Sequence, residues 1–140
     1  MLFRSYLTSD RSDGEQWHIE ETTQRQLIAE RCFATMKTKL HFNMCDLESS
    51  FVRNNDVCDL ADRAKFQIPP YLKYACLHWA QHLRDVSYSP ELFGMLSDFA
   101  KERLLFWFEV LSLTGSFGRV ATDALTVASD WSKVSLLVRW

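Results

Sequence analysis

Two histidines four residues apart are the first candidates for chemistry in this chain of 140 residues. On a helix, the spacing of His78 and His82 brings both imidazoles to one face, where they can bind the same metal ion. A zinc site needs a third and usually a fourth ligand, and the nearest further donor, Cys76, lies about 200° around the helix from His78. No glutamate follows His78, as it would in a zinc protease. The spacing therefore favours exposed histidines, and we expect no metal site.

A nucleophilic cysteine is the second possibility. Cys45 or Cys76 would need His41 or His78 beside it, together with an amide or acid that orients the imidazole. Nothing in the pattern indicates such a group, and free cysteines are among the most buried residue types. No Cys-x-x-Cys pair occurs among the cysteines, which are Cys32, Cys45, Cys58 and Cys76. We therefore expect buried thiols, no catalytic residue, and a reducing, cytoplasmic location.

The sequence also argues against phosphate, nucleic acid and membrane as partners, and we expect none of them. A phosphate-binding loop needs closely spaced glycines before a lysine, whereas the glycines here are Gly14, Gly94, Gly115 and Gly118. The formal net charge of −2 provides no attraction to nucleic acid or to an anionic membrane. The longest apolar run, Leu104 to Phe108, is far shorter than the roughly 20 residues that span a bilayer. No cofactor is expected either.

Two denser runs of side chains have plain structural explanations. A charged run predicts a solvated helix face with ordinary ion pairs, and it consists of Asp98, Lys101, Glu102 and Arg103. An aromatic run predicts buried core rather than a cofactor pocket, because large rings dominate buried area, and it consists of Phe99, Phe106, Trp107 and Phe108.

The elements that must position these residues are mainly helical. Apolar residues make up 47% of the chain, with only four Gly and three Pro, so the composition fits one folded domain or a slice of a larger one. Residues 1–19 form two extended stretches around a turn at 9–14, which predicts a β-hairpin that needs a surface to pack on. Residues 20–140 predict a helical domain. The expected fold class is mainly α, a helical bundle with a short N-terminal β-hairpin.

Apolar spacing and capping signals predict the helices of residues 20–140. The first begins near the capping box of Thr23 and Gln26, and its inner face is expected to carry Leu27, Ile28, Cys32, Met36 and Leu40. A short helix is expected over 57–65. Pro69 and Pro70 then open a helix whose apolar stripe is Leu72, Ala75, Cys76, Trp79, Ala80 and Leu83.

A serine cap and a proline mark the next helix start, at Ser89 and Pro90. We expect this helix to run on through Leu111, with an inner face of Leu92, Phe93, Leu96, Phe99 and Ala100. A turn at 114–116 should end it. The last helix is expected from Phe117 to Ser132, with an inner face of Val120, Ala124, Leu125, Ala128 and Trp131. The principal core residues should be Trp79, Leu83, Phe99, Leu104, Trp107 and Leu111.

Several phrases of the chain resemble one family. Residues 72–83 are similar to the phrase LxYACRFWAxHL, and residues 102–112 to EKxLYWLEVLSL. Residues 3–12 resemble SFRDFLTDPDRS, with Ser5 in place of the family's acid, and 27–32 and 40–45 resemble LAxRCLxxM and LRFNIC. These phrases, in this order, are typical of fungal NACHT-domain proteins of the NOD-like receptor type, signalling NTPases that often end in WD40 repeats. The part after Gly115 fits the family less well.

The resemblance implies a place within a larger switch protein. In that family these phrases lie after the NTPase core, at the end of the winged helix and in the following helices. The expected hairpin over 1–19 would be the wing, and 20–140 the helical region between NTPase and sensor repeats. Such helices hold the inactive state closed and relay rearrangement on nucleotide exchange. No catalytic residue carries over, because the family's nucleotide site lies outside the matched phrases.

Three functional hypotheses follow. The first is a non-catalytic regulatory and scaffolding segment of a NACHT-type signalling NTPase, or a short degenerate relative, which contacts neighbouring NACHT or WD40 domains through apolar surface that includes Trp17 and Trp140. The apolar end at 136–140 also predicts a piece of something longer. The alternative is a free-standing helical adaptor that binds a partner helix in a groove. The third, a small metal-dependent or cysteine-based enzyme, lacks converging polar groups.

Overall fold

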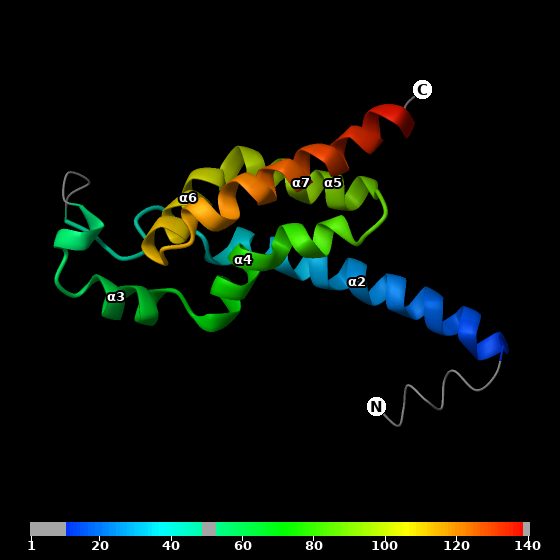
Figure 1. Ribbon diagram of the computed structural model, residues 1–140, viewed down its shortest axis with the longest axis horizontal. Coiled ribbons are helices and arrows are strands. Elements are labelled where there is room, and N and C mark those ends of the chain that lie inside the picture. The colour runs from blue at the N-terminus through cyan, green and yellow to red at the C-terminus, as the bar shows by residue number, and fades with distance from the viewer. Residues whose placement is uncertain (1–10, 49–52, 139–140) are drawn as a thin grey trace.

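The computed structural model describes residues 11–48 and 53–138, and the side chains of 20–48 and 53–133. This part of the chain is mainly helical and contains no strand, which confirms the mainly α fold class. Figure 1 shows the helices and their order along the chain. They are α2 (Arg11–Lys39), the 3₁₀ turn η1 (Asn54–Asp56), α3 (Leu60–Gln67), α4 (Pro70–Arg84), α5 (Pro90–Glu102), α6 (Leu104–Leu113) and α7 (Phe117–Val138).

Helix α4 is the centre of the arrangement. It packs against α2 on one side and against α7 on the other, and it also contacts α6 (Figure 1). Helix α5 packs on α2 and α6, whereas the short α3 lies at the edge against α6. The N-terminal half of α2 and the end of α7 extend beyond the other helices on the same side of the molecule. None of the described helices has an apolar stretch long enough to cross a membrane.

Helix α4 forms as the sequence predicts. Pro70 occupies its first turn, where the missing N–H of proline costs no hydrogen bond, and the backbone N–H of Leu72 bonds to the carbonyl of Pro69. All six residues of the predicted stripe are buried, namely Leu72, Ala75, Cys76, Trp79, Ala80 and Leu83. A stripe of this width lets α4 contact helices on more than one side.

The start of α5 is also confirmed. The hydroxyl of Ser89 accepts the backbone N–H of Leu92 at 3.4 Å and donates to the Glu91 carboxylate at 2.7 Å. The hydrogen bond from Ser89 lowers the pKa of Glu91, so the acid stays charged beside the positive end of the helix. On the inner face Leu92, Leu96 and Phe99 are buried, whereas Ala100 is exposed, contrary to expectation.

The expectation that this helix continues through Leu111 is wrong. The backbone leaves helical geometry at Arg103 (φ −122°, ψ −5°), and α6 begins at Leu104 in a new direction. The stretch 104–108 is apolar on all sides, so one straight helix would leave much of it in water. The break turns Trp107, Val110 and Leu111 into the core, while Leu104 is only partly buried and Leu105 is exposed.

The turn between α6 and α7 confirms the predicted stop at 114–116. Gly115 has φ +70°, a left-handed conformation that glycine adopts without a steric penalty. The backbone N–H of Ser116 then bonds to the carbonyl of Leu111 at 2.7 Å and closes the end of α6. Helix α7 begins at Phe117 as predicted but continues past Ser132 to Val138. On its inner face Ala121 is buried in place of Leu125, which is exposed.

Helix α2 differs most from expectation. It begins at Arg11 rather than near Glu20, so Thr23 lies inside the helix and is not its cap. Leu27 and Ile28 were expected to face inward, but they are 46% and 41% exposed. The buried residues of α2 and the residue that follows it are Ala29, Cys32, Phe33, Met36 and Leu40. The physical reason is that α4 and α5 contact the face that carries Phe33, whose large ring packs on Trp79.

The β-hairpin expected over residues 1–19 stays a prediction, because residues 1–10 lie outside the described part of the chain. The backbone of residues 11–19, which includes the stretch expected to be its second strand, belongs to α2. A helix satisfies its hydrogen bonds within one segment, whereas a strand needs a partner. The short helix expected over 57–65 is present as α3, which spans Leu60–Gln67.

A cluster of four aromatic rings joins α2, α4, α5 and α6. Trp79 lies 5.5 Å from Phe33, 5.0 Å from Phe99 and 5.5 Å from Trp107, measured between ring centroids. The indole N–H of Trp107 donates to the carbonyl of Cys76 at 2.9 Å. Among the described side chains, the indole N–H of Trp79 is the buried polar group without a hydrogen-bond partner. One side chain from each of four helices thus meets at a single point of the core.

Matched Trp-to-Phe substitutions should separate the ring packing from the hydrogen bond. Trp107→Phe loses ring area and the bond to Cys76, whereas Trp79→Phe loses ring area and an unpartnered N–H. We expect Trp107→Phe to lower the free energy of unfolding by about 1–2 kcal/mol more than Trp79→Phe does. Urea unfolding followed by circular dichroism measures both. An equal or larger loss for Trp79→Phe would contradict the assigned role of the Trp107 bond.

Candidate functional site

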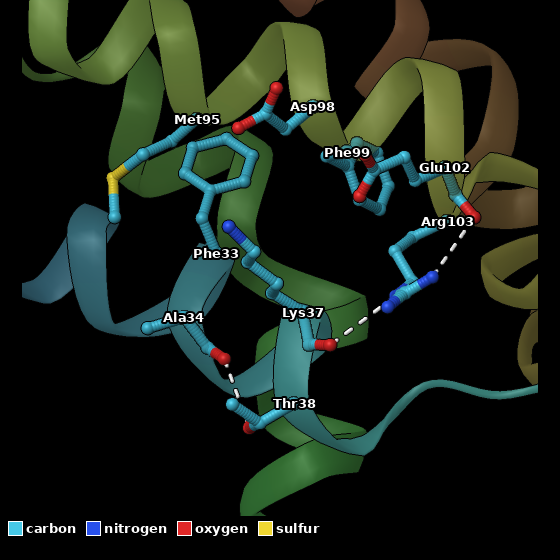
Figure 2. A pocket seen from close by; sticks show the side chains of 9 residues that line it. All are labelled: Phe33, Ala34, Lys37, Thr38, Met95, Asp98, Phe99, Glu102 and Arg103. Carbon is cyan, nitrogen blue, oxygen red and sulfur yellow. Dashed lines mark hydrogen bonds between the residues drawn. The ribbon is translucent and has the colours of Figure 1, made fainter.

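A small, largely apolar pocket lies between α2 and α5. Its volume is about 140 Å³, and Figure 2 shows the side chains that line it. Phe33, Met95 and Phe99 supply its apolar lining, and Ala34 and Thr38 of α2 form part of its wall. The rings of Phe33 and Phe99 are 6.0 Å apart and tilted by 60°. These rings belong to the aromatic cluster of the core, so the walls are held by packing on both sides.

Charged side chains surround the mouth of this pocket. They are Lys37, Asp98, Glu102 and Arg103, two of each sign. The guanidinium of Arg103 donates to the carbonyl of Lys37 at 3.2 Å and to that of Glu102 at 3.4 Å, as Figure 2 shows. It also lies 5.9 Å from the ring centroid of Phe106. Arg103 therefore ties the break between α5 and α6 to the end of α2. The expected solvated charged face is confirmed for Asp98, Lys101 and Glu102, which are exposed, but the ion pairs expected along it are not among the salt bridges of the described residues.

A wider hollow of about 610 Å³ lies between α4 and α7, and it is more open to solvent. His78, Gln81 and Arg84 line it from α4, and Arg119 and Asp123 from α7. Polar and apolar groups alternate along it, and no pair of these side chains is hydrogen-bonded except His78 with Gln81, at 3.2 Å. Its chemistry points to no particular ligand.

The two histidines of α4 pack on a tyrosine. The Tyr74 ring lies 4.7 Å from the His78 ring and 5.7 Å from the His82 ring, and its hydroxyl is 2.7 Å from Nε2 of His82. Partial burial lowers the pKa of His82, and repulsion from His78 lowers it further, whereas Asp85 acts in the opposite direction. A neutral His82 with its proton on Nδ1 accepts the Tyr74 hydroxyl.

No metal-binding group forms around these histidines. Within 20–48 and 53–133, no three side chains of His, Cys, Asp or Glu gather in a geometry that holds a metal ion. Cys76 is buried in the core, on a different face of α4 from the half-buried His78. The structure therefore does not bring together the residues that the sequence offered as ligands.

The three buried cysteines are not activated. Burial raises the pKa of Cys32 to about 11 and that of Cys76 to about 12, so both stay protonated thiols at neutral pH. Burial and the charge of Glu109 raise the pKa of Cys45. No hydrogen bond joins a cysteine to a histidine among the described side chains, so neither Cys45 nor Cys76 has the base that a nucleophile needs. Cys58 alone of the four is exposed.

Glu109 was not singled out by sequence reasoning, yet it holds a loop. Its two carboxylate oxygens accept the backbone N–H groups of Asn43 and Met44, each at 3.1 Å. Asn43 and Asp46 have positive φ, 56° and 51°, and the Asn43 side chain bonds to both backbone groups of Leu47. The carboxylate compensates part of the cost of this strained backbone. The signal in the sequence was weak, a single acid within the apolar stretch of α6.

We found no match to this chain among protein-family models, curated proteins or solved structures. The resemblance to NACHT-type proteins therefore stays a prediction. The two tryptophans expected to dock neighbours, Trp17 and Trp140, lie outside the described side chains.

Thiol labelling should follow exposure and protonation state. With iodoacetamide at pH 8, we expect Cys58 to react at least ten times faster than Cys32, Cys45 or Cys76, because only a thiolate that solvent reaches is a good nucleophile. Peptide mass spectrometry after timed quenching measures each rate. Cys58→Ser should remove the fast phase, and full labelling should need denaturant. Fast labelling of Cys45 or Cys76 in the folded chain would show an activated thiol that the structure lacks.

Glu109→Ala should loosen the loop that Glu109 holds. We expect the free energy of unfolding to fall by about 1–3 kcal/mol, because two backbone N–H groups lose a charged acceptor. Amide exchange at Asn43 and Met44 should accelerate together. Glu102→Ala, which removes an exposed carboxylate, is the matched control and should change neither quantity. Unchanged exchange at both amides in Glu109→Ala would remove Glu109 from this role.

Proposed function

We propose that this chain is a non-catalytic helical segment that regulates and scaffolds a larger protein by packing against its neighbouring domains. The observation that supports this most is the large apolar side chains that stay on the surface although the chain builds a complete core. Phe66 is 85% exposed, Phe42 78% and Leu105 74%. Apolar surface of this kind is typical of faces that another protein surface covers.

Two of these side chains belong to segments that a hydrogen bond joins. Leu105 and Glu109 are four residues apart on α6, which puts them on the same helix face. The Glu109 carboxylate accepts the backbone N–H of Asn43, the residue directly after Phe42. The segment that carries Phe42 is thus attached to the helix that carries Leu105, and these two exposed side chains are here called the Phe42–Leu105 edge. An edge of this composition favours contact with a neighbouring domain over contact with water.

The resemblance to NACHT-type signalling proteins suggests what the larger protein is. On this proposal, α2 to α7 pack between an NTPase core and sensor repeats in the cytoplasm and help to hold the inactive state closed. The lack of an activated nucleophile or metal group among the described residues fits a role without catalysis. A Walker motif in the coding sequence upstream would support this strongly, whereas a reading frame that begins at Met1 and ends at Trp140 would favour the alternative.

That alternative is a free-standing helical adaptor that binds a partner helix in a groove. The observation in its favour is the apolar hollow between α2 and α5, which two exposed helix faces flank. The same surface serves either function, so the flanking coding sequence separates them better than any binding measurement does.

The proposed function predicts that the isolated chain exposes apolar surface that promotes self-association. We expect concentration-dependent self-association in sedimentation velocity and fluorescence enhancement of a hydrophobic dye at neutral pH. The double variant Phe42→Ser/Leu105→Ser should reduce both by at least twofold and leave the unfolding midpoint unchanged, because both side chains are exposed. Thr122→Ser, at an exposed position of α7, is the control. A clean monomer that binds no dye would count decisively against the proposal.

A further inference from the structure

We draw no further inference here: the strongest candidate, the outward face of α6 at Leu105, which stays exposed on a helix that is apolar on nearly all sides, belongs to the Phe42–Leu105 edge already described, and nothing in the described part of the chain shows what covers it.

Discussion

The contact of Trp107 with α4 is the interaction on which the other packing depends. Its ring meets Trp79 and Phe99, and its indole N–H bonds to a carbonyl in the middle of α4. This bond sets the rotation of α6 relative to α4. Helix α6 contacts α7 in turn, and α4 contacts α2. One side chain therefore sets the alignment of helices that are far apart along the chain, and the pocket between α2 and α5 inherits its shape from the same cluster.

The sequence predicted well wherever one local signal decided the outcome. The prolines and the serine cap placed the starts of α4 and α5, and Gly115 placed the end of α6. The six-residue stripe of α4 was recovered in full, because its spacing puts these residues on the faces that α2, α6 and α7 contact. These features need no knowledge of neighbouring elements.

The sequence-based predictions failed where contacts with another helix determine the structure. No local sequence signal indicates that α5 ends before Arg103, because the break is stabilised by a hydrogen bond from the Arg103 side chain to the carbonyl of Lys37 in α2. The buried face of α2 was predicted wrongly because Phe33 packs on the ring of Trp79, which lies 46 residues away in the chain. The pocket could not have been foreseen either, because its walls come from two helices whose relative placement follows from the aromatic cluster. The possible metal site was suggested only by the spacing of its residues along α4. In the fold, Cys76 faces the core and the half-buried His78 lies on a different face of the helix.

The three hydrogen bonds that join Arg103 and Glu109 to segment 37–44 have a mechanical consequence. Arg103, at the start of α6, is bonded to Lys37, and Glu109, near its other end, is bonded to Asn43 and Met44. Segment 37–44 is thus fastened at both ends to a single helix and moves with it. Helix α2 has 29 residues and is about 44 Å long. A displacement of the last turn of such a helix would therefore have to move α6 with it or break the Arg103 and Glu109 bonds.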